Sequence, residues 1–328
     1  MRCLVTGVAG FVGSHLAERL LADGHEVCGI DGFIDYYPRY IKERNLERAR
    51  SWKRFTFVEG NLLTIDLVPM LEGVDWIFHQ AAQAGVRASW GREFARYEDC
   101  NVLATQRLLE ATVLIKGLRR FVYASSSSVY GDTSVLPVSE TVTPHPLSPY
   151  GVTKLAAEHL CTLYHRNFGV PTVALRYFTV YGPRQRPDMA FHRFCKAVLV
   201  RGPLVVYGDG QQTRDFTFIS DVVEANIGAA TSENVIGHVM NIAGGSRVSL
   251  RHVIQLLREI SGYSLRETFE AKQRGDVRDT FADTTLAERL IGYRPVVSLC
   301  EGLAQEFTYI TSLYENAKLL QTNTVTVG

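Results

Sequence analysis

Tyr150 and Lys154 are the first residues whose types and spacing could do chemistry. Ser148 and Pro149 supply a helix start just before them, and residues four apart share one face of a helix. A tyrosine usually has a pKa of about 10, too high for a base at neutral pH. A neighbouring ammonium group favours the phenolate and lowers that pKa. The pair could therefore act as a general base, although an isolated pair of this kind is more often solvated on a helix surface.

Four consecutive serines, residues 125–128, lie upstream of this pair at the end of an expected strand. In open parallel sheets, ligands bind in the crevice at the carboxyl ends of the strands. The serine hydroxyls would face that crevice, and the Tyr150 helix follows them in the chain. This order is difficult to attribute to chance, although a purely structural role remains reasonable for two of the four serines.

Gly7, Gly10 and Gly13 form a Gly-x-x-Gly-x-x-Gly turn between an expected strand, residues 2–6, and an expected helix. Glycines there permit a tight turn and let helix N-terminal amides approach a pyrophosphate. The triplet alone is a weak signal, but Asp31 ends the second expected strand about 20 residues further on, which makes it strong. Asp31 can accept hydrogen bonds from both adenosine ribose hydroxyls and would repel a 2′-phosphate. We therefore expect NAD rather than NADP.

The elements that position these residues alternate between strands and helices. Strands are expected at residues 2–6, 26–30, 55–59, 76–79, 121–125 and 172–177, and helices after Gly13, around 98–113 and around 150–167. This alternation predicts an α/β fold with a doubly wound parallel (Rossmann) sheet and right-handed crossovers.

Beyond residue 177 the alternation fades, which suits a smaller C-terminal α/β substrate-binding domain. We expect the Rossmann domain to span 1–176, with a return segment near 217–245, and the second domain to span mainly 177–328. Residues 238–243 look like one more buried strand that returns to the first sheet.

The composition of the chain limits its class. Among 328 residues, 35 basic and 34 acidic side chains give a net charge of +1, which argues against a general polyanion binder and a nucleic-acid partner. No apolar run approaches the roughly 18 residues that span a bilayer, and the first glycine comes too early for a signal peptide. Six scattered cysteines without a Cys-x-x-Cys pair indicate buried thiols in a reducing cytoplasm, with no disulfide framework and no metal site.

Taken together, the glycine turn, the serine strand and the Tyr150/Lys154 pair resemble the extended short-chain dehydrogenase/reductases, in their NAD-dependent epimerase/dehydratase branch. The similarity runs over nearly the whole chain. Further stretches resemble UDP-glucuronate 4-epimerases more closely than UDP-glucose 4-epimerases: residues 35–37, 79–87, 176–183, 186–190, 213–216 and 275–277.

This resemblance implies a catalytic role for three residues. Tyr150 would take the proton of the sugar C4 hydroxyl, and Lys154 would hold the nicotinamide ribose and lower the tyrosine pKa. Ser126 would hydrogen-bond the reacting oxygen, and a role shared with Ser127 or Ser128 stays open. The NAD contacts implied are Gly7, Gly10, Phe11, Val12, Gly13, Asp31, Asn61, Leu62, Gln80, Ala81, Ala82, Asn101, Tyr150, Lys154 and Tyr177.

On the side of the nucleotide sugar, the resemblance implies that Arg214 clamps the diphosphate with its guanidinium fork. Asp276 is placed to meet the uridine ribose. Residues 273–274 depart from the proline expected before Gly275, which puts the phosphate contacts there in doubt. Arg87 faces the same crevice and is a candidate contact for the sugar or a phosphate, and Ser126 and Ser128 are further candidate substrate contacts.

The residues after Ser126 discriminate between reactions that share a first oxidation at C4. Dehydratases of this branch carry an acid and a base there, and decarboxylases carry a glutamate. In this chain both positions, Ser127 and Ser128, hold hydroxyls without a pKa near the working pH. This favours an epimerase.

The expectation of a uronate rests on Thr179 and Arg186, a hydroxyl and a guanidinium suited to a 6-carboxylate. The 4-keto-uronate intermediate is a β-keto acid, which loses CO₂ when the carboxylate bond aligns with the carbonyl π system. We expect the two residues to hold the carboxylate out of that alignment. Alternatively, Arg186 is a solvated loop charge and Thr179 a turn hydroxyl.

Other readings stay open at this point. A UDP-glucose/galactose 4-epimerase or a UDP-glucuronate decarboxylase is the alternative among enzymes. Among proteins that are not enzymes, the alternative is an NAD-binding redox sensor, although such modules usually lack the Tyr/Lys pair. We expect a homodimer, because the stretch 101–113 and the Tyr150 helix resemble the surfaces that pair relatives through four helices. His79 is expected to be a packed core histidine, and Tyr36 and Tyr37 to form a lid or cap their loop.

Overall fold

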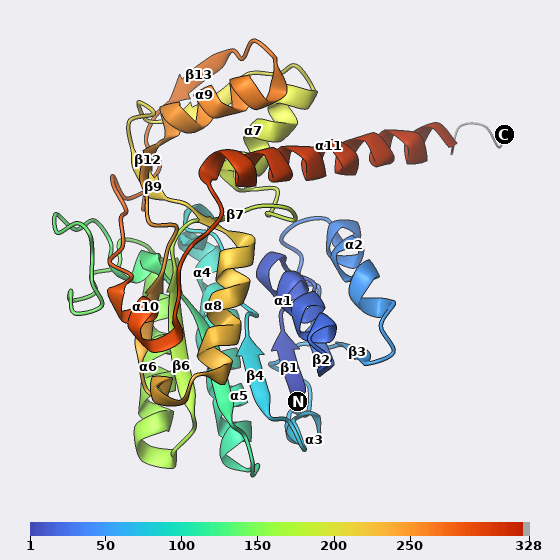
Figure 1. Ribbon diagram of the computed structural model, residues 1–328, viewed down its shortest axis with the longest axis vertical. Coiled ribbons are helices and arrows are strands. Elements are labelled where there is room, and N and C mark those ends of the chain that lie inside the picture. Colours follow the sequence, from blue (N-terminus) through green and yellow to red (C-terminus); the bar gives the residue numbers. More distant parts are fainter. Residues whose placement is uncertain (324–328) are drawn as a thin grey trace.

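The computed structural model describes residues 1–323, and the side chains of residues 1–315. Its centre is a sheet of seven strands in the order β11-β6-β5-β4-β1-β2-β3 (Figure 1). All neighbouring pairs are parallel. The strands are β1 (Arg2–Thr6), β2 (Glu26–Asp31), β3 (Phe55–Glu59), β4 (Trp76–His79), β5 (Arg120–Ser126), β6 (Thr172–Tyr177) and β11 (Val239–Ile242). The predicted strands are therefore present, within one or two residues.

Helices cover both faces of this sheet, so its central strands are buried on both sides rather than on alternate residues; all seven residues of β5 are buried. One face packs on α1 (Phe11–Ala22), α2 (Arg39–Arg50) and α8 (Ile219–Thr231), whose apolar residues share one core with the strands. The other face packs on α3 (Val68–Leu71), α5 (Ala104–Val113) and α6 (Pro149–Phe168). The doubly wound α/β class is confirmed.

One helix differs from the expectation. The segment 98–113 is not a single α-helix: residues Glu98–Leu103 form a π-helical turn, η3, that continues into α5. The buried Asn101 lies in this turn, where its backbone carbonyl accepts a hydrogen bond from Thr105 Oγ1 (2.7 Å) and its side chain bonds to neighbouring segments. A π-turn often marks a functional position in a helix.

A smaller layer of strand pairs and helices lies at the carboxyl ends of the strands (Figure 1). Three strand pairs belong to it, namely β7 (Val180–Tyr181) with β10 (Thr217–Phe218), β8 (Leu204–Tyr207) with β13 (Glu267–Glu270), and β9 (Thr213–Asp215) with β12 (Arg247–Ser249). Its main helices are α7 (Ala190–Leu199), α9 (Leu250–Ser261) and α11 (Leu299–Asn323), which share a third apolar core. The short helices do not all belong to this layer. They are α4 (Phe94–Tyr97), α10 (Thr285–Ile291), η1 (Arg87–Ser89), η2 (Gly91–Glu93), η4 (Ser127–Val129) and η5 (Glu233–Val235), and α10 packs in the core of the large sheet.

After building part of this smaller layer, the chain returns to the large sheet. Helix α8 packs against its face, and β11 pairs with β6 at the sheet edge. A division into residues 1–176 and 177–328 stays a prediction, since the path crosses between the two layers more than once.

The sequence predicts neither a membrane-spanning segment, nor a metal site, nor a disulfide framework. Within residues 1–323 no helix has the length and apolarity to cross a membrane, and no group of three metal-ligating side chains comes together. All six cysteines are unpaired thiols: four are buried, Cys100 is half-buried and Cys300 is exposed.

Candidate active site

A cavity of about 670 Å³ opens at the carboxyl ends of the large sheet, beneath the smaller layer. This volume suits a small-molecule or cofactor site. With one exception, the cavity is lined by every residue predicted as a contact. On the cofactor side these are Gly7, Gly10, Phe11, Val12, Gly13, Asp31, Asn61, Leu62, Gln80, Ala81, Ala82, Tyr150, Lys154 and Tyr177. On the substrate side they are Arg87, Ser126, Ser127, Ser128, Thr179, Arg186, Arg214 and Asp276.

The exception is Asn101, which was expected to contact the cofactor. It is buried behind the cavity wall, where its amide accepts from the backbone N–H of Gln83 (2.8 Å) and donates to the Gln83 carbonyl (3.0 Å) and to Thr153 Oγ1 (2.9 Å). The π-turn of η3 places it there. Asn101 thus fixes the loop after β4 against helix α6, and Gln83 lines the cavity in its place.

The glycine turn has the geometry of a tight anion-binding corner. Gly7 has φ +69°, and a side chain there would press on the backbone of Ala81 at 2.7 Å. A side chain at Gly13 would overlap the carbonyl oxygen of Gly7. Gly10 is the N-cap of α1 and offers no side chain to its amides. Free amides at a helix N-terminus bind phosphate groups, so the turn fits a pyrophosphate.

Asp31 ends β2 and joins the turn to the next loop. One carboxylate oxygen accepts from the backbone N–H of Ala9 (3.0 Å) and the other from that of Phe33 (2.8 Å). Each oxygen keeps lone pairs for a further donor. Burial raises the pKa of Asp31, and the two backbone hydrogen bonds act in the opposite direction. The position fits a ribose diol, and with the glycine turn it makes the cavity suited to a dinucleotide.

The start of α6 positions Tyr150 and Lys154. The Ser148 hydroxyl caps the helix by accepting from the backbone N–H of Gly151 (3.1 Å), and Pro149 is the first helical residue. Tyr150 and Lys154 follow on the face that lines the cavity. Burial lowers the pKa of Lys154 to about 8, and its ammonium nitrogen lies 4.7 Å from the centre of the Tyr123 ring.

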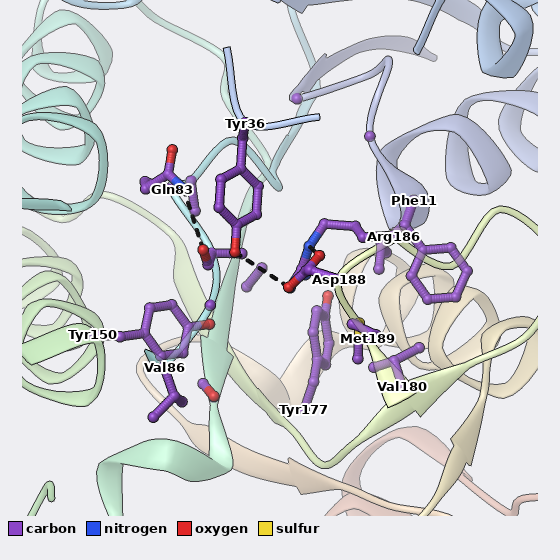
Figure 2. A pocket seen from close by; sticks show the side chains of 18 of the residues that line it. Phe11, Tyr36, Gln83, Val86, Tyr150, Tyr177, Val180, Arg186, Asp188 and Met189 are labelled. Atoms are coloured by element: carbon purple, nitrogen blue, oxygen red, sulfur yellow. Dashed lines mark hydrogen bonds and ion pairs between the residues drawn. The ribbon is translucent and has the colours of Figure 1, made fainter. Parts of the chain in front are cut away.

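Burial also raises the pKa of Tyr150, and two groups oppose this effect: a hydrogen bond with Ser126 and the positive charge of Arg186. The charge of Arg186 thus favours ionisation of the Tyr150 phenol. Figure 2 shows Arg186 opposite Tyr150, on the substrate side of the cavity. The sequence had pointed to Lys154 for this effect.

The three candidate serines are not equivalent in the structure. Ser126 is the last residue of β5; its side chain acts to lower the pKa of Tyr150, and its Oγ accepts from the backbone N–H of Ser128 (3.2 Å). Ser127 and Ser128 start the short helix η4 and line the cavity as well. Of the three, Ser126 has the geometry to share a reacting oxygen with the phenol.

Sequence reasoning missed a buried network beneath this pair. Glu158, one turn beyond Lys154, accepts from Ser125 Oγ (2.6 Å) and from two nitrogens of Arg176 (3.0 and 2.6 Å). Arg176 also donates to the hydroxyl of Tyr130 (2.7 Å), which donates to Asn241 (2.7 Å). The spacing of Glu158 from Lys154 was the only available signal. The network ties β5, β6, α6 and β11 together next to Lys154.

A second missed residue is Asn226 on α8. Its side-chain oxygen accepts from Gln80 Nε2 (3.0 Å) and from the hydroxyl of Tyr177 (3.0 Å). Both partners line the cavity, so Asn226 fixes them from behind. His79, in contrast, is the packed core histidine that was predicted: it lies between Thr6 (2.7 Å) and Thr105 (2.9 Å), and burial lowers its pKa to about 3.

Three charged residues lie at the far end of the cavity: Arg87 in η1 after β4, Arg214 in β9, and Asp276 in the loop after β13. The guanidinium of Arg87 forms an ion pair with Asp276 (2.8 Å) and lies 4.2 Å from the centre of the Tyr207 ring. Arg214 donates to the backbone carbonyls of Thr213 (2.8 Å) and Val277 (2.9 Å), which fixes its direction. Burial lowers the pKa of Arg214, and the carboxylate of Asp276 favours its charged form.

Arg186 approaches the reaction centre from the loop after β7. It binds both oxygens of Asp188, through Nε (3.0 Å) and Nη2 (2.9 Å), and Tyr36 donates to the same carboxylate (3.2 Å). Figure 2 shows these three side chains at one side of the cavity. Tyr37 lines the cavity together with Tyr36. Asp188 was not singled out as a site residue, although it lies in the stretch 186–190.

The NAD dependent epimerase/dehydratase family model matches residues 3–243. An uncharacterized UDP-glucose epimerase of Bacillus subtilis (strain 168) is 51% identical over 316 residues, 96% of this chain and 99% of the relative. A UDP-glucuronate 4-epimerase of Thermodesulfobacterium geofontis (strain OPF15) is 34% identical over 97% of this chain and 98% of its own.

A solved structure also resembles this chain over nearly its full length. The UDP-glucuronic acid 4-epimerase of Bacillus cereus, in complex with UDP-glucuronic acid and NAD, has a TM-score of 0.94 at 48% identity, covering 96% of this chain and 100% of that one. Fold, cofactor class and sequence all agree with the prediction made from the motifs. The chain belongs to the NAD dependent epimerase/dehydratase family.

Proposed function

We propose that this chain is a nucleotide-sugar 4-epimerase that interconverts UDP-glucuronate and UDP-galacturonate. The observation that carries the proposal is the meeting of Tyr150, Ser126 and Arg186 in one cavity that also contains the glycine turn and Asp31. The relatives named UDP-glucuronate 4-epimerase support it, as does the likeness to the enzyme complexed with UDP-glucuronic acid and NAD.

In this proposal the chemistry is divided between the residues and the cofactor. NAD, when bound, accepts hydride from C4 of the sugar and returns it to the other face. Tyr150 removes the C4 hydroxyl proton as the 4-keto sugar forms and gives it back afterwards. Ser126 hydrogen-bonds the reacting oxygen, and the buried Lys154 holds the nicotinamide ribose. Proton transfer by a positioned side chain contributes about 10²- to 10⁴-fold to such a rate.

Residues at the far end would hold the nucleotide. The Arg214 guanidinium, fixed by backbone carbonyls, would contact the diphosphate. Asp276 would reach the uridine ribose after its present partner, Arg87, turns toward the sugar or a phosphate. The rotation of the 4-keto sugar takes place between these fixed points and Tyr150.

The uronate assignment depends on Thr179 and Arg186, which line the cavity near the catalytic tyrosine. A guanidinium forms two parallel hydrogen bonds with a carboxylate. The serines at 127 and 128 offer no acid or base for elimination, which disfavours a dehydratase. The intact Tyr150/Lys154 pair disfavours a redox sensor without catalysis.

A second candidate is a UDP-glucose/galactose 4-epimerase. The relative that is 51% identical carries the name UDP-glucose epimerase, so a specific observation favours it. The two candidates share every step at C4 and differ only in the group at C6. With a neutral hexose, the Arg186 guanidinium would have no carboxylate to bind.

We further propose that the enzyme works as a homodimer in the cytoplasm. Helices α5 and α6 run side by side on one face of the sheet, and α6 exposes Val152 and Leu163, 49% and 52% accessible, three turns apart on one side. With Leu103, 45% accessible at the start of α5, they form an apolar stripe suited to a four-helix contact between two copies.

One assay separates these functions. The purified enzyme is incubated with UDP-glucuronate and, separately, with UDP-glucose, and the products are identified by NMR. Formation of UDP-galacturonate at a much higher kcat/KM than UDP-galactose is the expected result. A preference for the hexose would favour the second candidate, and UDP-xylose as the main product would identify a decarboxylase.

A further inference from the structure

The guanidinium of Arg186 is only partly used within the protein. Asp188 takes one N–H on Nε and one on Nη2. A guanidinium carries five N–H groups, so both N–H groups of Nη1 and one of Nη2 remain. Among the side chains of residues 1–315, no other hydrogen bond of this guanidinium is found. The side chain is 20% accessible, and its free edge is open to the cavity that it lines.

Asp188 is itself held in place. The hydroxyl of Tyr36, from the loop after β2, donates to Asp188 Oδ2 (3.2 Å), and the Tyr36 ring lies 5.7 Å from the Arg186 guanidinium carbon. That hydroxyl packs against Gly85, whose φ is +105°, and a side chain at Gly85 would overlap it. Three loops thus converge on one ion pair (Figure 2), and the direction of Arg186 is determined by all of them.

The position of this pair relative to the reaction centre gives it a chemical role. The charge of Arg186 favours ionisation of Tyr150, and the pKa of Arg186 is raised chiefly by Asp188. The guanidinium therefore stays charged close to the phenol. The ion pair of Arg186 with Asp188 is nearly neutral as a whole. A substrate carboxylate would therefore be bound by the fixed N–H groups of Arg186 more than by a net positive charge.

Resting on the proposed function, we propose that Asp188 is a positioning residue that decides between epimerisation and loss of CO₂. In the 4-keto-uronate, decarboxylation breaks the C5–C6 bond. The electron pair of that bond forms an enolate, which takes up one proton at C5, and the products are CO₂ and a 4-keto-pentose. The bond breaks readily only when it is aligned with the carbonyl π system. An Arg186 held by Asp188 and Tyr36 keeps the carboxylate turned away from that alignment.

The test compares Asp188→Asn with the parent enzyme on UDP-glucuronate. The products are separated by chromatography into UDP-galacturonate and decarboxylated UDP-pentoses, and reduced cofactor is followed by its absorbance. An aspartate that merely stabilised the loop would lower both products together. We expect the decarboxylated fraction to rise on the order of tenfold, while KM changes much less, because a small misplacement of a substrate group changes partition strongly.

A second variant keeps the test informative should Asp188→Asn fold poorly. Tyr36→Phe leaves the ion pair but removes the hydroxyl that holds it, and we expect a smaller rise in the same fraction. The matched control is Asp23→Asn, which removes the carboxylate paired with Arg19 (2.9 Å) away from the cavity; it should leave the partition unchanged.

The outcomes separate this inference from the function on which it rests. Unchanged partition in both cavity variants, with a parent enzyme that makes UDP-galacturonate, would overturn the role of Asp188 and leave the proposed function intact. A parent enzyme with no activity on UDP-glucuronate would overturn both.

Discussion

The two walls of the cavity position their groups by different means. The wall formed by the large sheet, here the cofactor wall, contains Gly7, Gly13 and Asp31, and it depends on backbone: a left-handed glycine, a helix N-terminus and a strand end. The wall formed by loops of the smaller layer, here the substrate wall, contains Arg186 and Arg214, whose directions are determined by ion pairs or backbone carbonyls. Residues at a fixed spacing in the sequence indicate the backbone geometry of the cofactor wall. The side-chain partners of the substrate wall come from segments that are distant in the sequence.

The largest expected effect lies where the two walls meet. Tyr150→Phe removes the phenol that the proposed mechanism uses to take the C4 hydroxyl proton, so kcat should fall about a thousandfold. Since the ring and its edge contact with Tyr97 at 6.2 Å remain, NAD content and melting temperature should match the parent. NMR of the UDP-sugars measures the rate. Turnover at the parent rate would remove the basis of the proposed function.

On the substrate wall, Arg186→Ala should raise KM for UDP-glucuronate about ten- to hundredfold, or release UDP-pentose, because a charge-assisted hydrogen bond contributes roughly 1.5–3 kcal/mol. The effect on UDP-glucose should be much smaller, since that sugar has no carboxylate. Steady-state kinetics on both sugars check this. Equal loss on the two substrates would mean that the guanidinium does not recognise C6.

The cofactor wall has a pH-dependent component in His79. Burial lowers its pKa to about 3 from 6.5, so between these values the unfolded chain binds the extra proton and the folded chain does not. Stability therefore falls as the pH drops below 6.5, by about 1.4 kcal/mol per pH unit. At pH 5 this amounts to about 2 kcal/mol.

This is tested by denaturant unfolding of His79→Gln and the parent at pH 7 and pH 5. The variant cannot take up this proton, so its stability should change less between the two pH values. Parallel pH dependence in the two proteins would show that other groups cause the acid sensitivity.

The smallest expected effect concerns Asn226, which supports the cofactor wall from α8. Asn226→Ala removes the acceptor shared by Gln80 and Tyr177, and each hydrogen bond contributes about 0.5–1.5 kcal/mol net. Release of NAD should become roughly threefold to tenfold faster, with kcat little changed. Asn234→Ala, at an exposed position in η5 beyond the end of α8, is the control. Unaltered NAD release would assign Asn226 to the core alone.

The contrast between the walls also explains what could be predicted from the sequence. The strands, the glycine turn, Asp31 and the Tyr150/Lys154 helix depend on periodicity and local spacing, and these predictions agree with the described fold. Asn101 lies in the π-turn η3 and does not line the cavity, since its side chain bonds to Gln83 and Thr153; a direct contact with the cofactor stays a prediction. The pairing of Asp188 with Tyr36 joins residues 152 positions apart, and no local pattern indicates such a contact.

The chain returns to the large sheet in β11, and this return limits which parts of the enzyme can be exchanged to alter its substrate range. A chain that ended at Tyr177 would make the six-residue β6, in place of the four-residue β11, the edge strand, and a longer row of unpaired backbone groups is a template for aggregation. It would also lose α8 from one face of the sheet. New substrate ranges are therefore expected to arise by exchange of residues in the loops after β7 and around Arg214, and not by grafting a different C-terminal module.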